Sequence, residues 1–493
     1  SSVKQAQKDG ASIENISAGL SISVVKNALY KVIRASSPEE LGRKIVVQGG
    51  TFYNEAVLRA FEKEMGVEVV RPDIAGLMGA YGAALYGKGR ARADQVSTVL
   101  DREALAGFRQ ETESRQCGLC GNNCQLTVNT FADGATFISG NRCDRPITGK
   151  ADDGAWNLYA YKRKLILGYK PVPGRRGKIG LPLCLNFWEL LPFWHTFFTK
   201  LGFTVYHSPF SSRNLYVQGQ GTIPSDTVCF PAKLAHGHIQ FLSKLGVDAI
   251  FYPCMTYNVD EGLGDNHYNC PVVAYYPELL MANCEKLNHN NFLYPFLDLN
   301  RRSHVVKTLS TMFSRYATKK QVETALEHGF AALEQYRKDI VAEGEEIVRQ
   351  ARDAGKQIIV LAGRPYHIDP EINHGINDLI TSFGFVLVTE DALSYLEGYA
   401  PRKVLNQWTF QSRMYNAARY VCTQPDMQVV QLVSFGCGTD AITTDEMRSI
   451  LEDGDKLYTQ LKIDDISNLG AVKIRIRSLM AAIEARKARE SQG

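Results

Sequence analysis

Short apolar runs alternate with segments of helical spacing through two stretches of the chain, residues 178–300 and 357–470. In the first stretch the pattern predicts strands at 178–184, 203–207, 247–252 and 272–276, and helices at 187–200 and 231–244. In the second it predicts strands at 357–362, 385–389 and 429–434, and helices at 372–383, 412–420 and 445–451. Strand–helix alternation favours parallel sheets, so we expect an α/β protein with two parallel layers.

A long helix is predicted between the layers, because apolar residues recur every three or four positions from Val322 to Ile340. The domains expected from these patterns are 151–315 and 357–493, with the helix at 316–356 between them and a linker at 150–177. A polar linker and a cysteine-rich unit fill residues 93–150. The length of 493 residues agrees with about three domains at roughly 150 residues each.

Residues 1–92 show a shorter α/β pattern, with helices predicted at 12–34, 53–65 and 75–86 and strands at 44–48 and 67–71. This segment lacks a phosphate-binding glycine loop followed by Lys-Ser/Thr, so we expect the tail of a nucleotide-binding domain and not a complete one. Gly49 and Gly50 follow a predicted strand and would allow a ligand to approach the backbone closely. A simple tight turn is the alternative explanation of this pair.

Composition excludes several classes of function. Lys and Arg number 56 against 52 Asp and Glu, a net charge of +4 that is too near balance for a nucleic-acid-binding protein. Apolar runs fall short of the roughly 18–20 residues of a membrane helix, and the first residues lack a signal-peptide pattern. We therefore expect a cytoplasmic protein that binds neither nucleic acid nor membrane. Its 11 cysteines indicate reduced thiols for metal binding more than a disulfide framework.

Four cysteines bracket a predicted β-hairpin. Cys117, Cys120 and Cys124 precede it, its turn is Asp133-Gly134, and Cys143 follows it. The hairpin would return Cys143 to the other three thiols, so the spacing predicts a four-thiolate metal site. Structural zinc and a small iron–sulfur cluster both take four thiolates, and the sequence leaves this choice open.

Three further cysteines are predicted at the carboxyl edge of the parallel sheets, where reactive groups gather. Cys254 and Cys437 each end a predicted strand, and Cys229 precedes a predicted helix. Helix N-termini after Cys229 and Cys437 would favour thiolate, so the three cysteines together could hold an iron–sulfur cluster. Cys270 is a fourth candidate ligand. The alternative is that these thiols are inert core residues, as we expect for Cys184, Cys284 and Cys422.

Other polar residues are predicted near the same edge. Lys233, His236 and His238 follow Cys229 on its helix, and packing in the core is the simpler explanation for each of them. The segments 363–369, which includes Arg364, and 388–391 follow two predicted strands of the second layer. Arg364 would suit contact with an anion.

The stretch IVVQGGTFYNEAVLRAFEKEMGVEVVRPDIAGLMGAYGAAL resembles the C-terminal end of the ATPase domain of 2-hydroxyacyl-CoA dehydratase activases, which have an actin/Hsp70-like fold. The resemblance implies that Gly49 and Gly50 contact adenosine. The motifs VCFPAKLAHGH, FYPC, LAGRPYHID and SFGCGTDAITTDE resemble the C-terminal region of large activase-like proteins. That region is similar to the cluster-bearing dehydratase subunits and to double-cubane cluster proteins, which implies cluster ligation by Cys229, Cys254 and Cys437.

The ATPase resemblance is incomplete. In activases the phosphate loops, the catalytic acid and the cysteines of their own 4Fe-4S cluster lie upstream of the matching stretch, and this chain has none of them. We therefore expect a C-terminal fragment that does not hydrolyse ATP alone, with ATP bound only by the intact protein.

These features together predict an iron–sulfur electron-transfer component of an ATP-dependent activase or reductase, whose cluster is a 4Fe-4S or a double cubane. Its expected partners are a dehydratase or reductase and an electron donor such as ferredoxin or flavodoxin, and a homodimer is compatible with the resemblance. The alternative is a metal-stabilised scaffold without catalytic function that docks a partner enzyme.

Overall fold

The computed structural model describes residues 3, 6–7, 9–33, 37–91, 96, 99–118, 124–141, 145–148, 156–225, 227–400, 404–434, 436–464 and 469–490. The chain divides into two compact units, 1–108 and 109–493, and each is described by itself. The predicted ligands Cys120 and Cys143 lie outside the described residues. Across the described ranges, no helix combines the length and apolar character needed to cross a membrane.

The first unit is mainly helical. Its elements are α2 (Ile13–Lys26), η1 (Asn27–Ile33), η2 (Pro38–Leu41), η3 (Gly50–Tyr53), α3 (Glu55–Met65), η4 (Ala75–Leu77), α4 (Met78–Arg90) and α5 (Arg102–Ala106). Val57, Phe61 and Met65 lie on one face of α3 and form a small core with Val25 and Leu29. The three helices predicted for this segment are therefore present.

The two strands predicted in the first unit are reduced to a single parallel bridge between Val46 and Val70. Val47 N–H donates to Val70 O, and Val70 N–H donates to Ile45 O, both at 2.9 Å. The side chains of Val46 and Val70 are 59% and 62% exposed. Two short extended segments without further strands are marginally stable, so the prediction of full strands is wrong here.

The glycine- and alanine-rich helix α4 has no buried residue. Large apolar side chains on this helix and on the turn before it are exposed: Ile74, Leu77, Tyr81, Leu85 and Tyr86. An exposed apolar group of this kind is typical of a surface that another protein segment covers.

The second unit opens with an antiparallel sheet of order β1-β2-β3, formed by β1 (Gln110–Gln116), β2 (Gln125–Phe131) and β3 (Thr136–Ser139). The hairpin of β2 and β3 confirms the prediction, and Gly134 has the positive φ of 78° that its turn requires. Strand β1 lies where the sequence predicts a linker. Its sequence QETESRQ is polar and all of its residues are exposed, so no apolar pattern indicates a strand. The segment is a strand because it pairs with β2. The helix α6 (Arg145–Thr148) follows.

The first α/β layer is a parallel sheet of order β5-β4-β6-β7. Its strands are β4 (Lys178–Leu181), β5 (Thr204–His207), β6 (Ala249–Phe251) and β7 (Phe292–Leu293). Its helices are α8 (Phe187–Lys200), α9 (Arg213–Gly219), η5 (Gln220–Thr222), α10 (Phe230–Leu245), α11 (Pro271–Asn283) and α12 (Arg302–Met312). The strand predicted at 272–276 is wrong. Its sequence VVAYY suits a strand, but Pro271 starts a helix there and Cys270 is the N-cap.

The second layer is also a parallel sheet, of order β11-β10-β8-β9. Its strands are β8 (Ile358–Ala362), β9 (Val386–Val388), β10 (Met427–Ser434) and β11 (Tyr458–Ile463). Its helices are η6 (Pro365–Ile368), α14 (Pro370–Asn373), α15 (Ile376–Ser382), η7 (Glu390–Ala392), η8 (Ser394–Leu396), α16 (Thr409–Cys422), α17 (Gly438–Asp453) and α18 (Leu469–Glu490). Helix α17 begins earlier than predicted, directly after Cys437. Two parallel α/β layers are thus confirmed.

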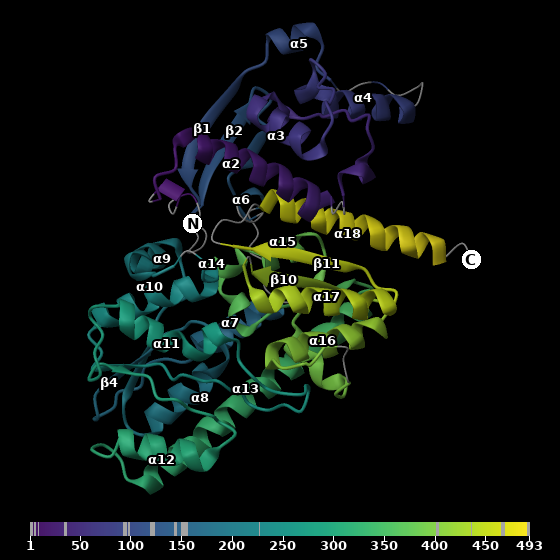
Figure 1. The fold of residues 1–493 in the computed structure, drawn as a ribbon. Helices are drawn as coiled ribbons and strands as arrows, with labels where there is room; N and C mark the ends of the chain where they lie inside the picture. Colours follow the sequence, from purple (N-terminus) through teal and green to yellow (C-terminus); the bar gives the residue numbers. More distant parts are fainter. Residues whose placement is uncertain are drawn as a thin grey trace. The chain divides into compact units, whose positions relative to one another are not determined.

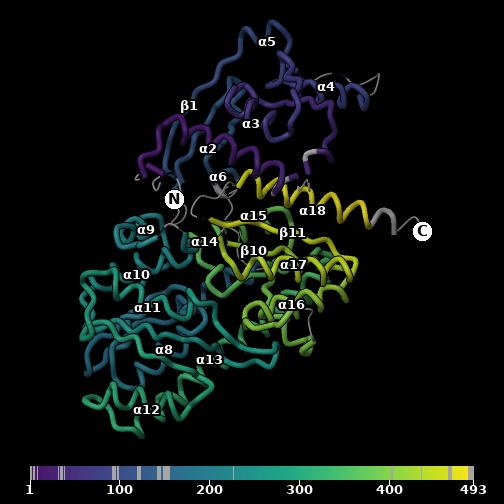
Figure 2. The backbone as a smooth tube through the Cα atoms, viewed as in Figure 1, coloured from purple at the N-terminus to yellow at the C-terminus, as the bar shows by residue number. Residues whose placement is uncertain are grey.

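The predicted long helix is α13 (Lys319–Asp353), which runs beside α8 between the two layers (Figure 1). Two glycines of α13 allow this helix to pack closely against both layers. A Cβ at Gly329 would lie 3.1 Å from Phe193 O in α8, and one at Gly344 would lie 2.6 Å from the Cβ of Ala392 in η7. In Figure 2 the teal first layer and the green-to-yellow second layer lie side by side along this helix. A single hydrophobic core extends through both layers.

Helix α7 (Leu158–Leu167) corrects the predicted linker at 150–177. Leu158, Tyr159 and Ile166 are buried in the common core. Asn157, its N-cap, forms a parallel bridge with Leu387 of β9. The helix was missed because basic residues interrupt its apolar face, among them Lys162, which is itself buried.

A buried hydrogen-bond chain runs from β4 to the second layer through His238 of α10. Leu183 N–H donates to Ser208 Oγ at 2.8 Å, and Ser208 Oγ is hydrogen-bonded to His238 Nδ1 at 2.7 Å. His238 Nε2 is hydrogen-bonded to Ser211 Oγ at 2.9 Å, and Ser211 N–H donates to Asp369 Oδ2 at 3.3 Å. Burial lowers the pKa of His238 to about 3. The packing role expected for this histidine is what the fold shows.

This histidine predicts a stability loss in acid. The unfolded chain takes up the His238 proton near pH 6.5 while the folded chain resists it, so stability falls as pH drops through this range. We expect H238Q to flatten the pH dependence of the unfolding free energy between pH 6 and 4 by about 1 kcal/mol per pH unit, measured by denaturant titration. H304Q, at an exposed histidine, is the control. An unchanged slope in H238Q would contradict the assignment.

Candidate functional site

Three cysteines occupy the N-cap positions of three helices in the second unit. Cys229 caps α10, Cys270 caps α11 and Cys437 caps α17. Each has a proline or glycine within the next two positions, which helps the chain turn into the helix. Burial raises the pKa of Cys229 and Cys270, and the backbone N–H groups that open α10 and α11 oppose this rise.

The three thiols lie close enough to influence one another. Burial raises the pKa of Cys229 to about 12, and the charges of Cys270 and Cys437 add to the rise. Burial and the Cys437 charge likewise raise the pKa of Cys270. Tyr366 of η6 faces the same group, since burial and the charges of all three cysteines raise its pKa. Cys229 and Cys270 of the first layer therefore lie within electrostatic range of Cys437 of the second.

Arg364, between β8 and η6, places a buried positive charge against this thiol cluster of Cys229, Cys270 and Cys437. Its Nη2 donates to Cys437 Sγ at 3.3 Å and to Thr439 Oγ1 at 3.2 Å. Nη1 donates to Asp440 Oδ2 at 3.2 Å, and that carboxylate also accepts from Ser434 N–H at 2.8 Å. Opposing the effect of burial, Arg364 lowers the pKa of Cys229 and Cys270. The Arg364 guanidinium is thus paired with the Asp440 carboxylate within the protein.

Cys254 has different neighbours. After β6 the chain stays extended, and Cys254 forms a parallel bridge with Phe296. Its N–H donates to Pro295 O, and its carbonyl accepts from Leu297 N–H, both at 2.9 Å. Burial raises the pKa of this thiol to about 12, with a further contribution from the Glu278 charge.

The remaining predicted residues lie elsewhere. Cys117 and Cys124 are half-buried, and Cys117 N–H donates to Cys124 O at 2.8 Å, which brings the two ends of their loop together. Gly49 has a φ of 100° and precedes Gly50, the first residue of η3. Cys184 and Cys284 are buried core residues, as expected.

Among the described residues, no three His, Cys, Asp or Glu side chains stand in an arrangement that would hold a metal ion.

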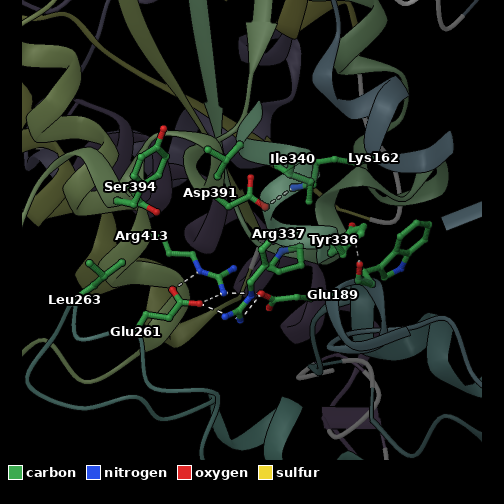
Figure 3. A pocket seen from close by; sticks show the side chains of 14 residues that line it. Lys162, Glu189, Glu261, Leu263, Tyr336, Arg337, Ile340, Asp391, Ser394 and Arg413 are labelled. Atoms are coloured by element: carbon green, nitrogen blue, oxygen red, sulfur yellow. Dashed lines mark hydrogen bonds and ion pairs between the residues drawn. The ribbon is translucent and has the colours of Figure 1, made fainter. Parts of the chain in front are cut away.

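A cavity of about 230 Å³ lies between the two layers and was not predicted. Figure 3 shows the guanidinium groups of Arg337 and Arg413 facing the carboxylates of Glu189 and Glu261 at this cavity. Arg413 binds Glu189 at 2.6 Å and Glu261 at 2.8 Å, and Arg337 binds both carboxylates at 3.0 Å. Burial opposes the ionisation of Glu189, but Arg413 and Arg337 hold its pKa below the ordinary value. We call these four residues the ion cluster.

The cavity and the thiol cluster share one turn. Pro365 lines the cavity, while the preceding residue, Arg364, contacts Cys437. Lys162 of α7 and Asp391 of η7 also line the cavity and form an ion pair at 2.7 Å. No local motif marks the pair of Lys162 and Asp391, because the two residues are separated by 229 positions in the sequence.

Comparison with known proteins gives two matches. Residues 178–393 match the family described as the CoA enzyme activase uncharacterised domain, which spans the first layer, α13, and the strands β8 and β9. A 2-hydroxyisocaproyl-CoA dehydratase activator from Clostridioides difficile is 38% identical over 87 residues. These make up 18% of this chain and 31% of the activator, so the chain spans about a third of that relative. Both matches are to proteins described as activases or activators of CoA enzymes.

The ion cluster predicts a large stability effect. In R413M the buried Glu189 and the half-buried Glu261 lose one of their two shared partners, and we expect the unfolding free energy to fall by about 3 kcal/mol. R352Q breaks an exposed pair with Asp426 and serves as the control, with an expected cost below about 1 kcal/mol. Denaturant unfolding measures both. Equal losses in the two variants would contradict the assigned role of Arg413.

Proposed function

We propose that this chain is an iron–sulfur electron-transfer component of an ATP-dependent activase or reductase that serves a CoA dehydratase or another low-potential reduction. The observation that carries the proposal is the meeting of three N-cap thiols, Cys229, Cys270 and Cys437, beside a buried arginine. The two activase matches support the choice of system.

The donor set fits an iron–sulfur cluster. Iron–sulfur clusters are bound by thiolates. The three N-cap cysteines are partly exposed, so a cluster could reach their sulfur atoms. Without a cation, burial and mutual repulsion keep the thiols of Cys229 and Cys270 protonated. A cluster would replace these protons and remove that cost. We therefore propose ligation by Cys229, Cys270 and Cys437, and Cys254, which the resemblance also implies as a ligand, is the alternative to Cys270.

The chain's own residues prepare this position. The N-termini of α10, α11 and α17 favour negative charge, and Arg364 adds a formal positive charge in contact with Cys437. Tyr366 and Arg364 are buried, so they shield this side of the thiols from water. When bound, the cluster supplies one-electron transfer at low potential. Three protein ligands would leave one iron of a 4Fe-4S cluster free, and a double cubane remains the alternative.

The first unit would contribute to an ATP site only in a longer protein. Gly49, at φ 100° with nothing within 4 Å of an added Cβ, leaves room for a ligand against the backbone. The exposed apolar side chains of α4 are those that the rest of an ATPase domain would cover. We infer that Gly49 and Gly50 contact adenosine there. The expected partners remain a dehydratase or reductase, with ferredoxin or flavodoxin as electron donor and a homodimer as one assembly.

Anaerobic reconstitution with iron and sulfide tests the proposal. If the cluster is a single cubane, the wild-type chain should bind about four iron atoms at this position and show a paramagnetic signal on reduction. C229A, C270A and C437A should each lose most of this signal, since each removes one thiolate ligand. C254A is the matched control at another buried cysteine and should retain it.

Two results would contradict this assignment. Equal losses in C254A and C270A would refute the ligand set. A wild-type chain that remains free of iron would instead favour a metal-stabilised scaffold that docks a partner enzyme.

We also propose that Cys117, Cys120, Cys124 and Cys143 hold a second metal, either zinc or a small iron–sulfur cluster. The β2–β3 hairpin and the closed loop between Cys117 and Cys124 support this proposal. C120S should release the metal and lower the melting temperature, because such sites rarely keep their shape without the ion. Metal analysis beside C422S, a cysteine of α16, checks the effect. Unchanged metal content in C120S would count against the site.

A further inference from the structure

Arg364 is fixed in place by contacts on every side of its guanidinium. Nη1 and Nη2 both bind the carboxylate of Asp440, and Nη2 also reaches Thr439 Oγ1 at 3.2 Å. Asp440 is anchored in turn by Ser434 N–H at the end of β10. Arg364 N–H donates to His367 Nδ1 at 3.1 Å, which holds the start of the η6 turn. The guanidinium therefore cannot leave Cys437 without breaking a buried ion pair.

The remaining contact of this guanidinium is the sulfur itself. Nη2 lies 3.3 Å from Cys437 Sγ, within the range of an N–H to sulfur hydrogen bond. The Thr439 hydroxyl lies 3.1 Å from the same sulfur, so the sulfur contacts both the guanidinium and a hydroxyl. Arg364 and Asp440 are both buried, so water screens their charges weakly.

We propose that Arg364 positions Cys437 as a cluster ligand and raises the reduction potential of the bound cluster through its hydrogen bond to the sulfur. This inference rests on the proposed function. Reduction adds one electron, and so one negative charge, to the cluster and its thiolates. Hydrogen bonds to ligand sulfurs and nearby positive charge stabilise the reduced state, which raises the potential. Arg364 is thus a positioning residue that acts through Cys437.

Asp440 should have the opposite effect on the reduction potential of the cluster. Its carboxylate offsets part of the Arg364 charge, so D440N leaves the guanidinium less compensated. The potential should then shift in the positive direction. A general loosening of the site would not move R364Q and D440N in opposite directions, so the pair of variants separates electrostatic tuning from structural damage.

The experiment compares the whole chain with its variants R364K, R364Q and D440N after anaerobic reconstitution. Iron content is measured first, and the midpoint potential is then obtained by redox titration with paramagnetic resonance detection. We expect a potential more negative than wild type in R364Q, a smaller negative shift in R364K, which keeps a charge, and a positive shift in D440N. R364Q should also bind less iron than R364K. R352Q, at an arginine paired with Asp426 away from the thiols, should match wild type.

The possible results separate the two proposals. A wild-type chain without a cluster overturns the proposed function, and this inference with it. A wild-type chain with a cluster, and Arg364 variants of unchanged potential, overturns this inference alone. If R364Q does not fold, as judged by circular dichroism, then R364K and D440N decide the matter. Shifts of these two in the same direction would refute the role of Arg364.

Discussion

The buried contact between Arg413 and the carboxylates of Glu189 and Glu261 joins parts of the chain that are far apart in sequence. Glu189 comes from α8 of the first layer, and Arg413 comes from α16 of the second. Removing charges from water is costly, so these groups are tolerable only while they face each other. Cys229 and Cys270 belong to one layer and Cys437 to the other. The thiol cluster therefore depends on the contact that holds the two layers in position.

Much of the fold could be predicted, because strand and helix periodicities are written in local sequence. The apolar runs of β4 and β10 and the spacing along α13 are examples, and the β2–β3 hairpin follows from its Asp-Gly turn. Local patterns failed where another force decided the outcome. Strand β1 is defined by pairing with β2 and has no buried residue. The segment 272–276 is rich in strand-forming residues, yet Pro271 and the Cys270 cap start a helix there.

The candidate site was predicted in part, for a related reason. The turn residues beside Cys229 and Cys437 indicated both cysteines, and in the structure each caps a helix, with the two thiols within electrostatic range of each other. The choice between Cys254 and Cys270 depends on where the chain runs after β6, and hydrogen bonds to Pro295 and Leu297 fix Cys254 beside the extension of β7. The spacing of residues along the sequence does not predict such tertiary pairing. The ion cluster was missed for the same reason.

The central claim is that the thiols of Cys229, Cys270 and Cys437 hold an iron–sulfur cluster between the two layers. Its most direct test is a crystal structure of the anaerobically reconstituted chain, with iron located by anomalous scattering. The account predicts an iron peak bounded by the N-termini of α10, α11 and α17, with Arg364 against the Cys437 sulfur. An iron peak beside Cys254, or a reconstituted protein without iron between these three helices, would contradict it.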